Sequence, residues 1–268
     1  SGFPRIAASF GGGGTPTQYM GTFPALLSAF GKVDLGFGAG QGVKCYHSEH
    51  LYGELWHRAF IVAVDSPHVN YILSCGHNGD AAAGVAGIWR HADARVRGMK
   101  RVQVEPHQSV TGGVAAEWIP IKPKTDAAFL YGIIHHILIE CNWREICDVE
   151  RLENDSNCPY LIGPNGYWMR DPKTRKPLIY DLEDEMPKPF DTNIQRPGME
   201  GKFIVSGVEI GADEDEWVHD KIEVTTSFQH LIEHIREYTP EWAEEQSDVP
   251  ADRIRAVATE FVSNACIG

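Results

Sequence analysis

The amino-acid sequence predicts an α/β protein whose doubly wound, mainly parallel sheet is Rossmann-like and carries a long irregular insertion. Short apolar runs alternate with longer helical patterns over residues 1–140, which is typical of parallel strands joined by crossover helices. Three of those runs end in short polar segments, and the alternation stops over residues 150–226. These three observations together favour an open sheet with one long excursion.

The first elements are two strands and two helices. Residues 5–10 are predicted to form a strand that ends at a run of glycines, and residues 19–30 to form a helix. Ser48 is placed to cap a second helix, and the apolar residues 69–74 form the next strand. The second helix carries an apolar face made by Leu51, Leu55 and Ala59.

A third helix is predicted between residues 85 and 96. Gly98 stands where a C-terminal cap is expected, and residues 101–104 form the strand that follows. The helix pattern rests on the apolar residues Val85, Ile88, Trp89, Ala92 and Val96, which recur at helical spacing.

The last strand of the series is predicted at 118–121, and a helix follows it from 126 to 140. Thr125 is the expected N-cap of that helix. Its apolar residues cover nearly the whole circumference, which predicts a buried helix.

Residues 150–226 are rich in Pro, Gly, Asn and Asp, and only one strand, at 202–208, is predicted within them. Loops of this length are usually functional or packed against a neighbour. An amphipathic helix at 227–238 follows. A final helix is indicated by Ile254, Val257, Ala258 and Phe261.

The composition excludes several classes of protein. The chain has 43% hydrophobic and 23% charged residues, as soluble globular domains do. Its formal net charge of −13 disfavours binding to nucleic acid, and none of its apolar runs reaches the ~20 residues that span a bilayer. Six cysteines without a Cys-x-x-Cys pair predict neither a disulfide framework nor an iron–sulfur cluster in this chain.

Polar residues follow three of the predicted parallel strands, where ligands bind in open α/β sheets. Gly76 would let a phosphate approach the backbone, and Asn78 would hydrogen-bond that phosphate. Glu105 can accept hydrogen bonds from both hydroxyls of a ribose, and Thr125 with Asp126 can accept the paired N–H donors of a guanine edge. The coincidence of three such segments predicts a nucleotide site.

Each segment alone also has a structural interpretation. The Gly-Asn turn can be only a turn, Glu105 a solvated strand end, and Thr125-Asp126 an ordinary helix start. The chain contains neither G-x-G-x-x-G nor a Walker A sequence, which disfavours a standard NAD or ATP site.

A second constellation surrounds Cys45 at the end of a glycine-rich stretch. Cys45, His47, His50 and His57 have spacings that allow a zinc site. Cys45 alone, at a helix start, is also placed where a thiolate is stabilised and could bind a soft or high-valent metal. A half-buried thiol without a metal is the third interpretation.

Four separated blocks of the sequence resemble the molybdopterin oxidoreductases of the dimethyl sulfoxide reductase type. Each of the first three blocks contains a predicted strand or most of it, together with the polar segment after it, and the fourth lies near the C-terminal end of the chain. They read NYILSCGHN at 70–78, RGMKRVQVEP at 97–106, EWIPIKPKTDAA at 117–128 and YTPEWA at 238–243.

The resemblance implies a fold, a cofactor and roles for residues. In that family a molybdenum or tungsten ion is held by two pyranopterin guanine dinucleotides. Carried over by position, Gly76 and Asn78 would contact cofactor phosphate, Glu105 the ribose, and Thr125 with Asp126 the guanine. Cys45 falls where the family has its metal-ligating side chain, and His47 or His50 would then move protons near the substrate.

The resemblance also implies an organisation. We expect the edge of a neighbouring α/β domain at 1–32, a dinucleotide-binding domain at 33–240 with its insertion at about 150–226, and a helical return segment at 241–268. The chain looks like an internal portion of a larger catalytic polypeptide, because it lacks the iron–sulfur segment and the closing C-terminal domain of the family. Expected partners are a small-molecule substrate, the remainder of that polypeptide, and an iron–sulfur electron-transfer subunit.

One position departs from the family pattern: His107 stands where an arginine commonly follows the acid-proline pair, so a phosphate contact there is not expected. The activity implied is two-electron oxidoreduction or oxygen-atom transfer by the parent enzyme, while this portion alone should be inactive. Two alternatives remain: a non-redox hydratase or transhydroxylase on the same scaffold, and a non-catalytic α/β binding or assembly module.

Overall fold

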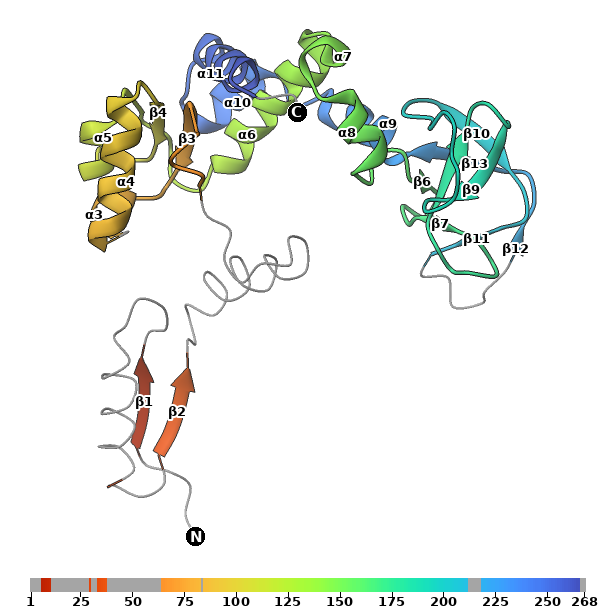
Figure 1. Ribbon diagram of the computed structural model, residues 1–268, viewed down its shortest axis with the longest axis horizontal. Coiled ribbons are helices and arrows are strands. Elements are labelled where there is room, and N and C mark those ends of the chain that lie inside the picture. Colours follow the sequence, from red (N-terminus) through yellow and green to blue (C-terminus); the bar gives the residue numbers. More distant parts are fainter. Residues whose placement is uncertain are drawn as a thin grey trace. The chain divides into compact units, whose positions relative to one another are not determined.

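The computed structural model describes residues 6–10, 29, 33–37, 64–82, 84–211 and 218–265. The chain divides into two compact units, Ser1–Asp65 and Ser66–Gly268. In the first unit, β1 (Ile6–Phe10) and β2 (Val33–Phe37) pair in parallel, with Ile6 opposite Val33 (Figure 1). The strand expected at 5–10 is thereby confirmed, and the helices expected at 19–30 and from Ser48 lie outside the described residues.

A three-stranded parallel sheet organises the second unit. Its strands stand in the order β3-β4-β5, so that β4 lies in the middle. Their bounds are Tyr71–Cys75 for β3, Lys100–Val104 for β4 and Glu117–Ile119 for β5. The three strands predicted from the apolar runs are present, and each end lies within two residues of its predicted position.

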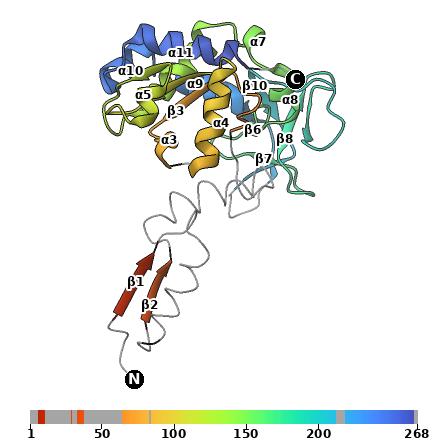
Figure 2. The same ribbon diagram turned by 60° about the vertical axis from the view of Figure 1, so that its left-hand side comes forward.

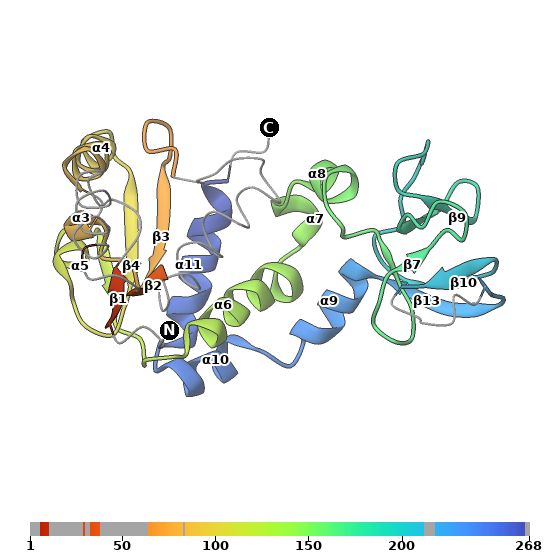
Figure 3. The same cartoon turned by 90° about the horizontal axis from the view of Figure 1, so that it is seen from below.

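Helices lie on both sides of this sheet (Figure 3). On one side are α3 (Gly79–Ala82), α4 (Gly84–Val96) and α5 (Val110–Val114). On the other side are α6 (Asp126–His135), its π-helical continuation η2 (His136–Glu140), α10 (Pro240–Ser247) and α11 (Ala251–Ser263). Gly98 ends α4 with φ +102, as its predicted role as a cap requires.

The two faces of the central strand β4 differ in chemistry because side chains alternate along a strand. Val102 and Val104 join the main hydrophobic core, which α6, α10 and α11 complete. Arg101 and Gln103 point to the opposite face and are also buried, 3% and 0% exposed. A buried polar layer therefore separates β4 from the α3–α5 side.

The helices α6, α10 and α11 pack closely against one another (Figures 1 and 2). Gly132 of α6 makes this possible: a Cβ at that position would lie 2.9 Å from Cβ of Ala243 and 3.1 Å from Cγ2 of Ile254. Both neighbours are fully buried.

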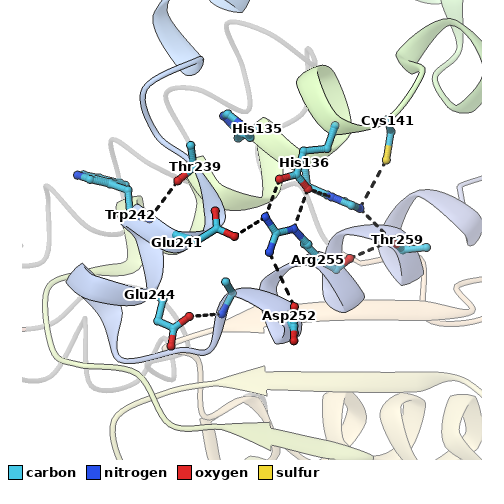
Figure 4. Close-up of polar contacts among 12 residues, drawn as sticks. His135, His136, Cys141, Thr239, Glu241, Trp242, Glu244, Asp252, Arg255 and Thr259 are labelled. Atoms are coloured by element: carbon cyan, nitrogen blue, oxygen red, sulfur yellow. Dashed lines mark hydrogen bonds and ion pairs between the residues drawn. The ribbon is translucent and has the colours of Figure 1, made fainter.

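Arg255 of α11 links this helix to the end of η2 and to α10 (Figure 4). Its guanidinium donates to both carboxylate oxygens of Glu140, at 2.8 and 2.7 Å, and to Glu241 of α10 at 2.6 Å. His136 contacts the same Glu140 carboxylate through Nδ1 at 2.6 Å, and its Nε2 lies 3.5 Å from the sulfur of Cys141. Arg255 and then His136 hold the pKa of Glu140 at about 2, well below its ordinary value.

Residues 155–226 form a β-rich excursion with its own hydrophobic core around Leu161, Met169 and Val208 (Figure 1). Its strands form two antiparallel three-stranded sheets and a hairpin. They are β6 (Leu161–Ile162), β7 (Met169–Arg170), β8 (Leu178–Asp181), β9 (Met186–Pro189), β10 (Lys202–Val205), β11 (Val208–Ile210), β12 (Val218–His219) and β13 (Ile222–Thr226).

Asp181 is the polar centre of the excursion. Its carboxylate is fully buried and accepts backbone N–H bonds from Glu183, Gln195 and Arg196 at 3.0 to 3.2 Å, together with Nζ of Lys188 at 2.8 Å. Lys188 first, and then those N–H groups, lower the pKa of Asp181. The Asp181 carboxylate thus holds residues 183, 188, 195 and 196 near one another, although the strands around them are short.

Short helices join the excursion to the rest of the second unit. They are α7 (Trp143–Ile146), α8 (Val149–Asn154) and α9 (Ser227–Ile235). Trp143, Phe228, Ile232 and Met199 of the excursion make a third core between them. None of the helices in the described part of the chain has the length and apolarity needed to cross a membrane.

One expectation about this unit is wrong. Only one strand was expected within 150–226, whereas the described residues between 161 and 226 contain eight, most of them too short to give a periodic signal. The helix predicted at 85–96 is present as α4, and three of its apolar residues are exposed: Ile88, Trp89 and Val96 are 39%, 68% and 88% exposed, while Ala94 is buried.

The coarse fold class is confirmed, since the protein mixes helices with small parallel and antiparallel sheets. The doubly wound, Rossmann-like sheet is not confirmed, because the described strands belong to separate sheets of two or three strands. The domain boundaries expected at residues 32 and 240 stay predictions.

Candidate functional site

The carboxyl ends of β3, β4 and β5 lie together at one edge of the parallel sheet. Gly76 donates its backbone N–H to the carbonyl of Val104 at 2.9 Å, and Glu105 donates to Ile119 at 3.1 Å. Each segment after a strand is thus bonded to the end of the next strand. The polar segments expected to converge are neighbours in the structure.

The start of α6 is close to the same edge. Burial, and after it the carboxylate of Asp126, raises the pKa of the Cys75 thiol at the end of β3.

Gly76 leaves open space at the end of β3. Its φ is +63, a conformation that favours glycine, and apart from its two chain neighbours none of the described residues has a heavy atom within 4 Å of the place where a Cβ would stand. The residue is exposed. A ligand can therefore approach the backbone here without displacing a side chain.

Asn78 is held in one orientation by Thr111 of α5. Oδ1 of Asn78 accepts from the backbone N–H of Thr111 at 3.2 Å and from its hydroxyl at 2.9 Å. Because a backbone N–H can only donate, these bonds identify the oxygen side of the amide. The Nδ2 donors of Asn78 make no hydrogen bond to the described residues and so remain for a ligand.

Thr111 also fixes the start of α3, because its hydroxyl oxygen accepts the backbone N–H of Asp80 at 2.8 Å. Thr111 is only 1% exposed. Sequence reasoning missed this residue, since α5 has five residues and no helical periodicity. The one available signal was Ser109, which caps α5 by accepting from Gly112 at 3.2 Å.

Glu105 is buried at the end of β4, 4% exposed, and its carboxylate is bonded within the chain. One oxygen accepts from Ser109 N–H at 2.7 Å and the other from Nε2 of Gln103 at 3.0 Å. Burial raises the pKa of Glu105, but the bonds from Ser109 and Gln103 outweigh it, and the pKa lies below its ordinary value. Glu105 is therefore a fixed negative charge inside the turn.

Thr125 occupies the N-cap position of α6 as predicted, but its hydroxyl does not cap the helix. It donates instead to the carbonyl of Lys122 at 2.6 Å. The first N–H groups of α6 consequently lack a side-chain partner. Asp126 is exposed at this helix start.

A buried ionic cluster of Arg101, Asp80 and His91 lies on the polar face of β4, between this strand and the helices α3 and α4. Nη1 of Arg101 contacts Oδ2 of Asp80 at 2.5 Å, and Nδ1 of His91 lies 3.5 Å from Oδ1 of the same carboxylate. Burial, followed by the charge of Arg101, lowers the pKa of His91. The alternation Arg101, Gln103, Glu105 along one strand was the sequence signal for this layer.

The other predicted site residues, Cys45, His47, His50 and His57, lie outside the described residues. Within the described part of the chain, no three His, Cys, Asp or Glu side chains gather as they would around a metal ion. His107, at the departure from the family pattern, is exposed.

Comparison with known proteins gives two curated relatives. The chain is 29% identical over 181 residues to a sulfite dehydrogenase subunit of Allochromatium vinosum, which covers 62% of this chain and 17% of that protein. It is 24% identical over 204 residues to the thiosulfate reductase molybdopterin-containing subunit PhsA of Salmonella typhimurium. That match covers 76% of this chain and 17% of that protein. The chain thus spans about a sixth of the length of the curated relatives it matches. No family model matches it.

Among solved structures, acetylene hydratase from Pelobacter acetylenicus has a similar fold. The TM-score is 0.51 at 17% sequence identity, over 91% of this chain and 23% of that one. At this identity the likeness concerns the fold alone.

Proposed function

The chain is related in sequence to the molybdopterin oxidoreductases, and we propose that it supplies one of the two dinucleotide-binding regions of such an enzyme. The proposed ligand is the guanine dinucleotide form of molybdopterin, carrying molybdenum or tungsten. The observation that supports the proposal is the edge at which Gly76 is bonded to the end of β4 and Glu105 to the end of β5. The influence of Asp126 on the pKa of Cys75 supports adding the start of α6 to this edge.

The phosphates are proposed to bind over Gly76. The open backbone there and the unpaired Nδ2 donors of Asn78 suit an anionic oxygen. Thr111 holds the Asn78 amide with its donors presented, so little conformational freedom is lost on binding.

The ribose is proposed to bind at Glu105. Each carboxylate oxygen has two acceptor sites, and the bonds from Ser109 and Gln103 use one on each oxygen. Glu105 is only 4% exposed, so its surroundings would have to open for a ribose hydroxyl to reach the remaining acceptor sites.

The guanine is proposed to bind at the start of α6. Asp126 is exposed there and can accept the two parallel N–H bonds of the guanine edge, which adenine lacks. Thr125 would contribute through its backbone, since its hydroxyl is bonded to Lys122.

When bound, the metal would supply two-electron redox or oxygen-transfer chemistry to the parent enzyme. Cys45 is proposed as its protein ligand, with His47 or His50 moving protons nearby. The expected partners are a small substrate, the rest of the catalytic polypeptide, and an iron–sulfur subunit.

The test uses guanosine diphosphate as a probe of the guanine arm, with adenosine diphosphate as its comparison. Calorimetric titration of the 268-residue chain should give saturable binding of the guanine nucleotide, at least tenfold tighter than the adenine nucleotide. Asp126→Asn should remove the preference. Asp93→Asn, an exposed carboxylate on α4, is the matched control and should retain it.

Equal binding of the two nucleotides, no binding of either, or a preference that survives Asp126→Asn would overturn the guanine assignment. The non-catalytic alternative is tested on the enzyme that contains this chain. Metal analysis together with pterin fluorescence should find molybdenum or tungsten with pterin, and their absence would favour a binding or assembly module.

A further inference from the structure

Cys141, His136 and Glu140 form a line of polar contacts at the end of η2. The sulfur of Cys141 lies 3.5 Å from Nε2 of His136 (Figure 4), and Nδ1 of the same ring lies 2.6 Å from Oε2 of Glu140. Arg255 fixes that carboxylate through two hydrogen bonds. A nucleophile within reach of a base, which a third group orients in turn, is the arrangement that activates thiols and hydroxyls in proteins.

The π-helical turn of η2 brings Cys141 to His136. On an α-helix, residues five apart point about 140° away from each other, because each residue advances the helix by about 100°. In η2 the backbone N–H of Cys141 donates to the carbonyl of His136 at 2.9 Å, five residues back. This wider turn places the two side chains in contact. Single π-helical turns are rare and occur frequently at functional sites.

Glu140 and Thr259 determine how the His136 ring holds its protons. Arg255 keeps Glu140 ionised, and an ionised carboxylate only accepts, so Nδ1 donates to it. Nε2 of the neutral ring is then an acceptor for the S–H proton of Cys141. Thr259 donates its one proton to the carbonyl of Arg255 at 2.9 Å, so its oxygen, 3.1 Å from Nε2, can accept from the protonated ring. Both ring nitrogens therefore have an acceptor once His136 has taken up the proton.

The thiol of Cys141 is partly exposed and carries its proton at rest. Burial, and after it the charge of Glu140, raises the pKa of this thiol. The thiolate is the form that attacks, so a reaction at neutral pH requires a base that removes the proton. His136 is the base in contact with the sulfur.

From this geometry we propose that Cys141 is a site of thiol–disulfide exchange with small organic disulfides. Sγ of Cys141 attacks one sulfur of the disulfide while its proton passes to Nε2 of His136. The new S–S bond forms as the old one breaks, so the Cys141 sulfur is oxidised and the other sulfur leaves as a thiolate, which takes up the proton. Acyl transfer would need donors for a developing oxyanion, whereas exchange needs only a thiolate with access to the disulfide. The site does not depend on the proposed nucleotide site.

The probe for the test is oxidised glutathione, added to the 268-residue chain at about pH 8, where an ordinary imidazole is neutral. Mass spectrometry after tryptic digestion measures the rate at each cysteine, and cleavage after Arg144 separates Cys141 from Cys147. Cys75 is the internal comparison: burial and a carboxylate raise its pKa too, and it has no hydrogen bond to a histidine among the described residues. Cys141 should react roughly tenfold faster than Cys75 or more.

Three variants test the roles of the neighbours. His136→Gln keeps a donor for Glu140 but removes the base, and it should bring the rate at Cys141 to within about threefold of the rate at Cys75. Glu140→Gln removes the charge that raises the thiol pKa, so a thiol acting alone would react faster. We expect the reverse, several-fold slower exchange, because the protonated ring loses its anion. Glu150→Gln, an exposed carboxylate of α8, is the control and should react as the parent chain does.

Circular dichroism and an unchanged rate at Cys75 identify the variants that are folded, and either His136→Gln or Glu140→Gln alone suffices for the test. Equal rates at Cys141 and Cys75 in the parent chain would overturn the proposal. So would an unchanged rate at Cys141 in His136→Gln, or faster exchange in Glu140→Gln.

Discussion

Arg255 on α11 holds Glu140 at the end of η2 through two parallel hydrogen bonds, Nε to Oε2 at 2.8 Å and Nη2 to Oε1 at 2.7 Å. Two-point pairs of this kind are geometrically specific and stronger than single contacts. Because Glu241 of α10 binds the same guanidinium, one side chain joins three helices that pack on the sheet.

Arg255→Lys should lower the free energy of unfolding by about 1–2 kcal/mol, since a lysine cannot reproduce the two-point pair. Urea unfolding followed by circular dichroism measures it. Glu241→Gln is the control: Glu241 is 61% exposed, so its loss should cost under about 0.5 kcal/mol. Equal costs would mean that the two-point geometry contributes nothing.

The same pair should make stability depend on acid pH. The pKa of Glu140 is about 2 in the folded protein, below its ordinary value of 4.5. A depressed carboxyl pKa adds stability above the unfolded value, and that stability is lost as the pH falls from about 4.5 to 2. The difference in unfolding free energy between the parent chain and Glu140→Gln should therefore shrink from about pH 6 to about pH 3. A constant difference would contradict the assigned pair.

Gly132→Ala should destabilise the protein by about 1–3 kcal/mol, because the new methyl group would press on Ala243 and Ile254. Gly113→Ala is the matched control: it lies in α5 with no heavy atom within 4 Å of the new Cβ. That substitution should be neutral or slightly stabilising, since alanine favours helix. Thermal unfolding of the two variants measures both effects, and similar shifts would argue against close helix contact at Gly132.

Thr111→Val should weaken binding of guanosine diphosphate and lower stability by about 1–3 kcal/mol, because it leaves the Asp80 N–H without its acceptor and Asn78 without one donor. Thr111→Ser keeps the hydroxyl and should restore most of both properties. Calorimetric titration and urea unfolding separate binding from stability. Unchanged nucleotide affinity in Thr111→Val would show that the orientation of Asn78 is irrelevant to the ligand.

Strands with strong apolar runs were predictable, and so was their common edge. Once β3, β4 and β5 are parallel, residues 76, 105 and 126 must emerge on the same side. The orientation of Asn78 was not predictable, because it depends on Thr111, 33 residues away. The exposure of Trp89 was not predictable either, since periodicity gives the apolar side of a helix but not what covers it.

Cys45→Ala in the enzyme that contains this chain should abolish or sharply reduce turnover while leaving the fold intact, if Cys45 binds the metal. Cys75→Ala, which removes a free thiol at the end of β3, is the comparison and should retain turnover. Steady-state kinetics on both variants measures turnover, and circular dichroism checks that each variant is folded. Full turnover in Cys45→Ala would remove that residue as the ligand.

The excursion leaves and rejoins the helical part of the second unit at one place, because Leu161 of β6 is paired with Thr226 of β13. Its two ends are thus held side by side by antiparallel hydrogen bonds, whatever lies between them. Evolution can lengthen, trim or replace such a module while the flanking helices keep their positions. Related enzymes can therefore diversify this appendage independently of the edge that we assign to the nucleotide.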